Sequence, residues 1–275
     1  MNKTFSLGFI EIHYYSLFIL LAFLTGIFIF YKLSKTRNIE FALIEDILFY
    51  TLLFGLIGAR LYYVLFNLDY YLSNPLEILM VWHGGLAIHG GIIAGAIALI
   101  YNSKKKKINF LELLDIAAPA VIIAQAIGRW GNFFNQEAHG PITTLAYLKK
   151  LHIPNFIING MKIGNNYYHP TFLYESIWNL LGGIILIILA RKKNLKKGMI
   201  IGLYLTWYSF ARFFIESLRT DSLMIFNIKV AQIVSTLLFI IGIYLVFIRK
   251  DNKNTISKKQ NKWYNLYIIK EDEWV

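Results

Sequence analysis

The sequence predicts an all-α polytopic membrane protein with seven transmembrane helices, the N-terminus outside and the C-terminus in the cytoplasm. Three observations lead to this fold class. Hydrophobic residues make up 57% of the 275 residues and charged residues only 16%, with a mean hydropathy of +0.51, which is more apolar than a soluble domain of this size. Apolar runs near the length of a membrane span recur along the chain. Basic residues collect in alternate connections between those runs.

The apolar runs define the expected spans. Their approximate bounds are residues 14–31, 45–66, 85–102, 111–128, 172–190, 198–216 and 230–248. The first run lacks a preceding basic cluster and a small-residue cleavage site, so we expect a retained helix rather than a cleaved signal peptide. Residues 1–250 thus form one expected transmembrane domain.

The net charge of +12 follows the topology. Of the 28 Lys and Arg residues, 19 lie after the first, third and fifth spans or in the C-terminal tail, whereas six lie on the opposite face. The positive-inside bias therefore places the N-terminus outside and the C-terminus in the cytoplasm. Because the charge is explained in this way, it does not indicate a nucleic-acid partner.

Two segments lie outside the spans. Residues 130–170 form the longest connection, expected on the extracytoplasmic side. Two short runs around Asn159-Gly160 predict a small β-hairpin there, namely Phe156-Ile157-Ile158 and Met161-Lys162-Ile163. This gives a small α/β cap between the fourth and fifth helices. Residues 251–275 form a basic cytoplasmic tail, which suits either a position on an anionic leaflet or a disordered segment.

The most unusual stretch of the sequence runs from Gly128 to Gly140. It closes the apolar run of the fourth span and sets several polar side chains among glycines and aromatics, including Arg129, Asn132, Asn135 and Glu137. A lipid-facing helix does not tolerate these groups together, and a water-facing loop has little use for the neighbouring Trp and Phe residues. We therefore expect a polar ligand here, at the edge of the membrane.

Ionisable side chains on other spans share the same expected depth. Arg60, Arg129 and Arg212 end outward-running helices, while His89 and Glu175 begin inward-running ones. All of them are expected in the outer part of the membrane. A shared cavity is the simplest account of so many charged groups at one depth.

Each of these residues also has a structural explanation. Arg60 could snorkel to the outer surface, and His89 could be a hydrogen-bonded structural group. Arg212 and Glu216 lie four residues apart on one helical face and could pair only to fix helix packing. Tyr15, at the outer entry of the first span, fits an interfacial aromatic belt.

No metal or cofactor is expected. His83 and His89 are six residues apart, unlike the His-x-x-x-His of a helical zinc site, and no acidic pair flanks them. The chain contains no cysteine, which excludes a disulfide, a thiolate metal site and a cysteine nucleophile.

Arginine indicates the ligand. Its planar fork matches phosphate oxygens bidentately, and the common phosphate at this depth belongs to a phospholipid. A phospholipid-processing enzyme is the first hypothesis, and a phospholipid or organic-anion transporter with an arginine-lined site is the alternative. The polar groups do not reach the membrane midplane, and no pair of inverted, broken helices is visible, which disfavours the transporter.

These motifs resemble the bacterial phosphatidylglycerol:prolipoprotein diacylglyceryl transferase family. The segments that carry the resemblance follow the family's order and cover nearly the whole chain: Gly58-Ala59-Arg60-Leu61-Tyr62, His89-Gly90-Gly91, Gly128-Arg129-Trp130-Gly131-Asn132-Phe133-Phe134-Asn135-Gln136-Glu137, His169-Pro170-Thr171-Phe172-Leu173-Tyr174-Glu175 and Arg212-Phe213-Phe214-Ile215-Glu216. The Gly-Arg-x-Gly-Asn-Phe-x-Asn-x-Glu signature is specific.

The resemblance implies a multi-pass enzyme of the bacterial cell membrane with its active site toward the extracytoplasmic leaflet. Such an enzyme moves the sn-1,2-diacylglyceryl group of phosphatidylglycerol to the thiol of the lipobox cysteine of a prolipoprotein and releases glycerol 1-phosphate. This is the first step of lipoprotein maturation, and the implied partners are phosphatidylglycerol, prolipoprotein signal peptides and membrane lipids. Because the nucleophilic thiol arrives on the substrate, the absence of cysteine fits this reaction.

The resemblance also implies residue roles. Arg129 and Arg212 would hold the phosphate, and His89 would be the candidate base. Asn132, Glu137 and Glu216 would orient the lipid or the arginines. The remaining implied substrate-binding residues are Tyr15, near the entrance, Arg60, Asn135, His169 and Glu175.

Three positions depart from the family's pattern. Gln136 stands where small residues such as glycine are common, and His139 occupies an aromatic position. His83 replaces a frequent acidic residue before Gly-Gly. His83 therefore offers a second histidine in the search for the base.

Overall fold

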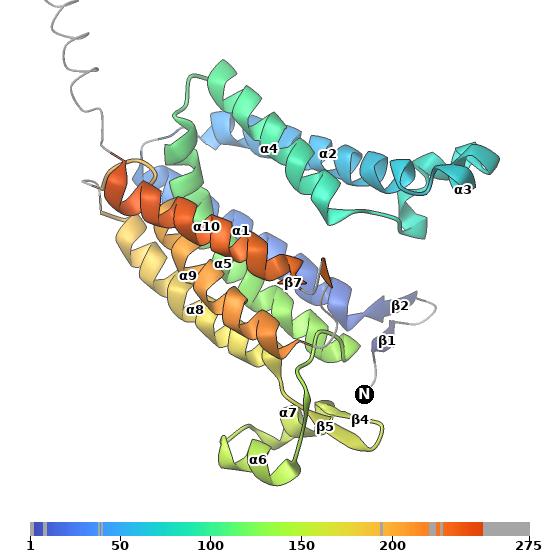
Figure 1. Ribbon diagram of the computed structural model, residues 1–275. Helices are drawn as coiled ribbons and strands as arrows, with labels where there is room; N and C mark the ends of the chain where they lie inside the picture. The colour runs from blue at the N-terminus through green and yellow to red at the C-terminus, as the bar shows by residue number, and fades with distance from the viewer. Residues whose placement is uncertain are drawn as a thin grey trace, which may run out of the picture.

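The computed structural model describes residues 3–7, 10–37, 39, 41–192, 195–219, 224–225 and 228–249, and these residues are mostly helical (Figure 1). Small antiparallel sheets lie at the ends of the helices. The basic tail expected at residues 251–275 lies outside the described residues.

A bundle of long helices forms the body of the molecule (Figure 1). Its members are α1 (Tyr14–Thr36), α5 (Phe110–Asn135), α8 (Thr171–Ala190), α9 (Met199–Leu218) and α10 (Val230–Ile243), which continues as a π-helical turn, Tyr244–Ile248. Asn109 is the N-cap of α5. Its side-chain oxygen accepts hydrogen bonds from the amides of Leu111 and Glu112 at 3.1 and 3.2 Å.

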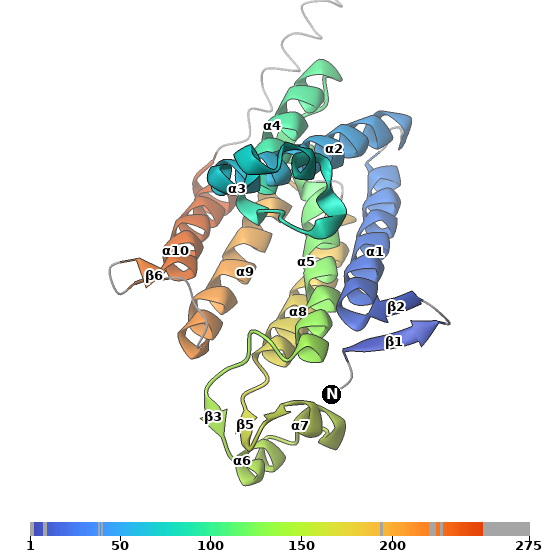
Figure 2. The same cartoon turned by 90° about the vertical axis from the view of Figure 1, so that its right-hand side faces the viewer.

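A second unit is the antiparallel pair of α2 (Phe41–Leu65) and α4 (Ile88–Lys105). Between them lie the short helix α3 (Leu68–Ser73) and two 3₁₀ turns, Pro75–Leu79 and Val81–His83. The glycines of both helices allow close packing: a Cβ placed on Gly58 would lie 2.7 Å from the carbonyl oxygen of Gly90. In Figures 1 and 2 this pair lies to one side of the bundle.

The two units join at one end through a common core. Buried side chains from α1, α2 and α5 meet there, including Phe30, Ile44, Ile47 and Leu113. A second apolar core lies at the opposite end of the bundle, where Phe133 of α5 and Phe172 of α8 pack against the cap. The polar residues near residue 130 therefore lie close to this second core.

The cap between α5 and α8 contains helices as well as strands. The helices are α6 (Leu145–Lys150) and α7 (Asn155–Gly160), and the antiparallel strands are β3 (Ile142–Thr143), β4 (Lys162–Ile163) and β5 (Asn166–Tyr168), in the order β3-β5-β4. The predicted strand around residues 156–158 is wrong, because Pro154 starts a helix that buries Ile157 and Ile158. The hairpin turn lies at Gly164, not at Asn159-Gly160.

Helix α5 extends beyond the predicted span. The expected span 111–128 ended directly before Arg129, but α5 continues to Asn135. At 1.5 Å per residue, the seven additional residues carry the helix roughly 10 Å further. The side chains of the polar stretch from Arg129 to Asn135 therefore lie on a helix.

Two further hairpins that the sequence analysis did not predict complete the described part of the fold: β1 (Thr4–Leu7) with β2 (Ile10–His13), and β6 (Met224–Ile225) with β7 (Ile228–Lys229).

Among the described residues, five helical segments are long and apolar enough to cross a membrane. They are Tyr14–Thr36, Ile44–Leu65, Phe110–Asn135, Thr171–Ala190 and Val230–Ile248. The chain is therefore a polytopic membrane protein. The other two predicted spans are helical too, as α4 and α9. Polar side chains lower the mean hydropathy of these two helices: His89 and the terminal lysines in α4, and Arg212 with Glu216 in α9.

Candidate active site

Four ionised side chains from α5, α8 and α9 form one cluster. The carboxylate of Glu175 lies between two arginines, because its Oε2 pairs with Nε of Arg129 and its Oε1 lies 2.5 Å from Nη1 of Arg212. Nη2 of Arg212 in turn lies 2.5 Å from Oε2 of Glu216. Their side chains are 4% to 22% exposed. We call these four residues the arginine–glutamate cluster.

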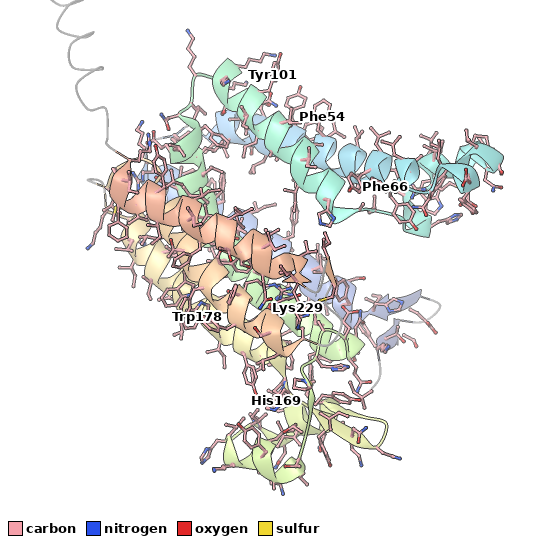
Figure 3. All side chains as sticks on the ribbon, viewed as in Figure 1. Phe54, Phe66, Tyr101, His169, Trp178 and Lys229 are labelled. Atoms are coloured by element: carbon pink, nitrogen blue, oxygen red, sulfur yellow. The ribbon has the colours of Figure 1, made fainter. Side chains whose placement is uncertain are left out.

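Polar contacts elsewhere fix the three helices that carry the cluster. Asp115 of α5 accepts hydrogen bonds from the amides of Gly198 and Ile201 at 2.7 and 2.9 Å, which caps the start of α9. The indoles of Trp178 in α8 and Trp207 in α9 stack, and each donates to the other's backbone carbonyl at 3.0 Å. Figure 3 shows Trp178 on its helix. These contacts set the positions from which Glu175 and Arg212 meet.

Lys229 fixes the C-terminal end of α9 (Figure 3). Its Nζ lies 2.6 Å from the carbonyl oxygen of Glu216, 3.2 Å from that of Ser217 and 2.7 Å from that of Arg219. A lysine at the last carbonyls of a helix satisfies acceptors that have no partner within the helix. In the sequence, Lys229 is one of the six basic residues expected on the opposite face from the C-terminal tail. No sequence motif around Lys229 predicts its contacts with α9.

The end of α5 carries a second polar group. Nδ2 of Asn132 donates to Oε1 of Glu137 at 2.9 Å, and Asn135 is the last helical residue. Gln136 follows with φ +56°, and its side chain donates to the carbonyl of Gly160 in the cap at 2.8 Å. The left-handed conformation explains why a glycine suits this position. Gln136 adopts that conformation here, and its side chain forms the hydrogen bond to the cap.

Tyr15 packs on the turn of α5 that carries these residues. A Cβ placed on Gly131 would lie only 2.8 Å from Cδ2 of Tyr15. The neighbouring Tyr14 stacks on Phe134, with ring centroids 4.7 Å apart. The first turn of α1 is therefore held against α5 between Arg129 and the end of the helix, which places Tyr15 beside Gly131.

His169 lies at the junction of the cap and α8 (Figure 3). Its Nδ1 lies 3.2 Å from Oη of Tyr174, and burial lowers the pKa of its imidazole. The amide of Gly140 donates to the carbonyl of His169 at 2.9 Å, and a Cβ on Gly140 would lie 2.7 Å from Cβ of His169. The end of the signature stretch therefore fits against α8 only as glycine. The sequence drew attention to Gly140 without showing this contact.

Gly140→Ala is expected to destabilise the protein, because the added methyl group overlaps His169 and the backbone has to shift. Overpacking of this kind costs about 1 to 3 kcal/mol, so thermal unfolding in detergent should begin at a lower temperature. Gly26→Ala is the matched control, since its Cβ would meet other atoms only at ordinary contact distances of 3.6 Å or more. Equal melting temperatures for the two variants would contradict the tight fit at Gly140.

Arg60 lies outside the arginine–glutamate cluster. It is 5% exposed and stacks over Tyr71 at 5.1 Å. Its guanidinium donates to five backbone carbonyls in the connection between α3 and α4: those of Glu77, Ile78, Met80, Gly84 and Gly85. All its N–H groups therefore have partners within the chain. Arg60 holds this connection in place and does not snorkel.

The structure does not bring His89 to the cluster either. His89 lies exposed in the first turn of α4, with its ring centroid 6.3 Å from that of Tyr62. Arg60 and His89 thus belong to the α2–α4 pair, whereas Tyr15, Asn132 and the cluster belong to the bundle. The sequence predicted the same membrane depth for the residues of the α2–α4 pair and of the bundle. It therefore could not tell that they lie in two separate groups. Within the described part of the chain, no three His, Asp or Glu residues gather as metal ligands.

The fold and the cluster define the class of protein. This is a multi-pass helical membrane protein that holds two arginine forks in fixed relation through one buried carboxylate. Guanidinium groups arranged in this way are suited to bind the phosphate of an anionic lipid.

Comparison with known proteins identifies the family. The model of the prolipoprotein diacylglyceryl transferase family matches residues 2–248. The phosphatidylglycerol–prolipoprotein diacylglyceryl transferase of Staphylococcus aureus strain MSSA476 is 51% identical over 252 residues, which cover 91% of this chain and 90% of the relative. The enzyme of strain Newman is 50% identical over the same shares. The chain belongs to the prolipoprotein diacylglyceryl transferase family and is a diacylglyceryl transferase, as the motifs predict.

Proposed function

We propose that the arginine–glutamate cluster is where this chain transfers the sn-1,2-diacylglyceryl group of phosphatidylglycerol to the cysteine thiol of a prolipoprotein. The names of its relatives support this donor and this acceptor. The observation that carries the assignment to this place is Glu175, whose carboxylate pairs with arginines from two other helices. A carboxylate in that position orients both guanidinium groups before the lipid arrives.

The reaction is a displacement at carbon. The sulfur of the acceptor cysteine attacks the glycerol carbon next to the phosphoester oxygen, a C–S bond forms and the C–O bond breaks. The electron pair of that bond leaves on the phosphate of glycerol 1-phosphate. The thiol proton goes first to a base and finally to the phosphate or to water. The chain must therefore stabilise a departing phosphate and assist the removal of a thiol proton.

The arginines meet the first requirement. Arg129 pairs with Glu175 through Nε, so both its NH₂ groups remain for phosphate oxygens. Arg212 uses one contact from each NH₂ group for Glu175 and Glu216 and keeps further N–H donors. Two forks at one place can hold the phosphate of the substrate and also receive the charge that develops when the C–O bond breaks.

The polar end of α5 supplies groups for the rest of the headgroup. Asn132 and Glu137, which follow Arg129 by three and eight residues, are already hydrogen-bonded to each other at 2.9 Å. Asn135 and His169 lie at the same end of the bundle. Amide and carboxylate groups match the hydroxyls of a glycerol headgroup, so we assign these residues to its orientation. Tyr15 lines the approach from α1.

His89 remains the proposed base, on the strength of the resemblance. His89→Gln is expected to flatten the pH dependence of the transfer rate, because glutamine keeps a polar side chain but cannot accept the thiol proton. The transfer rate should be measured from about pH 5 to about pH 9, which covers roughly two units either side of neutral pH. His83→Gln is the matched control and should keep the wild-type profile. An unchanged profile with full activity in His89→Gln would make His89 structural.

The topology proposed for the chain has seven membrane helices, with the N-terminus outside and the C-terminus in the cytoplasm. Helices α4 and α9 are the two additional spans, and their polar residues would face protein or water-filled space rather than lipid. The distribution of Lys and Arg supports this orientation. It places the cap and the cluster toward the extracytoplasmic leaflet of the bacterial cell membrane and residues 251–275 in the cytoplasm.

The test of the proposed function is a transfer assay with purified protein. Vesicles containing phosphatidylglycerol are incubated with a lipobox peptide that carries either cysteine or serine at the acceptor position. A thioether product and glycerol 1-phosphate with the cysteine peptide only are expected. Lipid movement between leaflets without any covalent product would instead favour a transporter.

A further inference from the structure

A hydrogen bond joins α5 to α9 on the side of the arginine–glutamate cluster that faces away from the cap. Nε2 of Gln125 in α5 donates to Oη of Tyr204 in α9 at 3.0 Å. Gln125 lies four residues before Arg129, and Tyr204 lies eight residues before Arg212. Positions four and eight residues apart share one face of a helix. The faces that carry the two arginines therefore also form this bond, which we call the Gln125–Tyr204 link.

Hydrogen bonds near the cluster also join the other two pairs of helices. The hydroxyl of Ser176 in α8 donates to the carbonyl of Ala126 in α5 at 2.8 Å. The indoles of Trp178 and Trp207 join α8 to α9. The Gln125–Tyr204 link completes the set, because it connects the two helices that carry the arginines.

The link lies close to the cluster, whereas the other hydrogen bonds between its two helices do not. In the described part of the chain, these other bonds come from Asp115, which accepts from the amides of Gly198 and Ile201. Asp115 lies ten residues before Gln125, roughly 15 Å away along α5. Apolar packing is non-directional, but a hydrogen bond holds two atoms within a narrow range of distance and angle. The link therefore sets the separation of α5 and α9 near the arginines.

The ionic contacts of the arginines change when the substrate binds. Glu175 pairs with both guanidinium groups, and phosphate oxygens bind to the same groups, so the lipid competes with the carboxylate. The amide and the phenol of the link are neutral and lie a helical turn or more from the arginines along their helices. Inside the membrane no water is present to replace their hydrogen bond. The link therefore persists while the charged contacts rearrange.

We propose that Gln125 and Tyr204 are positioning residues, which hold α5 and α9 at the spacing that lets both arginines reach one phosphate in the transition state. The inference rests on the proposed function. The two residues act through Arg129 and Arg212 and not by contact with the lipid. A misplacement of about 1 Å in such an arrangement can lower a rate by up to about 100-fold. Loss of the link should therefore slow the transfer step more than it weakens the binding of either substrate.

Tyr204→Phe tests the proposal. The substitution removes one oxygen and keeps the ring, whose centroid lies 5.9 Å from that of Tyr208, so the helix packing should be retained. In the transfer assay, kcat at saturating phosphatidylglycerol and peptide should fall about tenfold, with both KM values unchanged. Gln125→Met keeps the length of the side chain but removes the donor, and it should have the same effect.

A double variant and a control separate the link from other effects. If the two residues act through one bond, the combination of Gln125→Met with Tyr204→Phe should be no slower than either single variant. Thr206→Val is the matched control, because it also removes a hydroxyl from α9. That hydroxyl donates to the carbonyl of Gly202 in the same helix at 2.9 Å, so Thr206→Val should keep the wild-type kcat.

Other results would overturn the assignment. A wild-type kcat in Tyr204→Phe would remove the positioning role, even if the variant unfolds at a lower temperature. Additive losses in the double variant would show that the two side chains act separately, and an equal loss in Thr206→Val would indicate a general disturbance of α9. A rise in KM alone would assign the pair to substrate binding. If the wild-type protein formed no thioether, the proposed function would fail and the positioning role with it, whereas full activity in both single variants would remove the positioning role alone.

Discussion

Arg129→Lys and Arg212→Ala are each expected to reduce thioether formation by about 100-fold or more. Lysine retains the charge of Arg129 but has no planar fork, so it loses both the Nε contact with Glu175 and the paired donors for phosphate. Alanine at position 212 removes the contacts to Glu175 and Glu216 as well. The measurement is the initial rate of transfer from phosphatidylglycerol to a cysteine lipobox peptide.

Membrane insertion separates a chemical defect from a folding defect. Both variants should reach the membrane in normal amounts, as measured by fractionation and by monodisperse elution in detergent. Arg191→Lys is the control, because Arg191 lies exposed at the opposite end of α8 and should transfer lipid at the wild-type rate. Near-normal rates for both cluster variants would remove the phosphate role from the two arginines.

Glu175→Gln is expected to have the second large effect. The amide keeps the shape of the side chain but removes the negative charge that two arginines share. Breaking a buried ion pair by neutralising one partner costs roughly 3 to 5 kcal/mol, so the variant should unfold at a lower temperature. Its transfer rate should also fall, because the two forks are no longer fixed relative to each other.

Glu112→Gln provides the comparison. Glu112 pairs with Lys197 at 2.5 Å, but the side chains are 21% and 40% exposed. Exposed pairs contribute about 0 to 1 kcal/mol, so this variant should keep both its melting temperature and its activity. If Glu175→Gln behaved in the same way as Glu112→Gln in both measurements, Glu175 would not organise the site.

The fold could be predicted where one residue pattern dominates. The apolar runs located the helices, since length and hydropathy are properties of a single segment. The end of α5 was missed because Arg129, Asn132 and Asn135 interrupt the apolar run, although helix α5 continues through them. The helical form of residues 156–158 was missed because three apolar residues fit a strand or a short helix equally well.

The site could be predicted in part. The four-residue spacing of Arg212 and Glu216 predicted a shared face, and their ion pair confirms it. That Glu175 also contacts both Arg129 and Arg212 depends on how three helices pack, which the spacing does not encode. The partners of Arg60 are backbone carbonyls up to 25 residues away, and any sequence offers such groups. The sequence around Arg60 therefore suggested an anionic ligand. In the structure, backbone carbonyls of the chain accept the hydrogen bonds of its guanidinium group.

The arginine–glutamate cluster has consequences for turnover. Two guanidinium groups and two carboxylates sum to zero formal charge. The phosphodiester of the donor lipid adds one negative charge, whereas the phosphate monoester that departs carries nearly two at neutral pH, since its second pKa is about 6. The doubled charge strengthens the attraction of the departing group to the two arginines and also its repulsion by the two glutamates. Because these two effects oppose each other, the cluster can stabilise the leaving phosphate without holding it as tightly as two unpaired arginines would, so the spent headgroup can leave and the next lipid can enter.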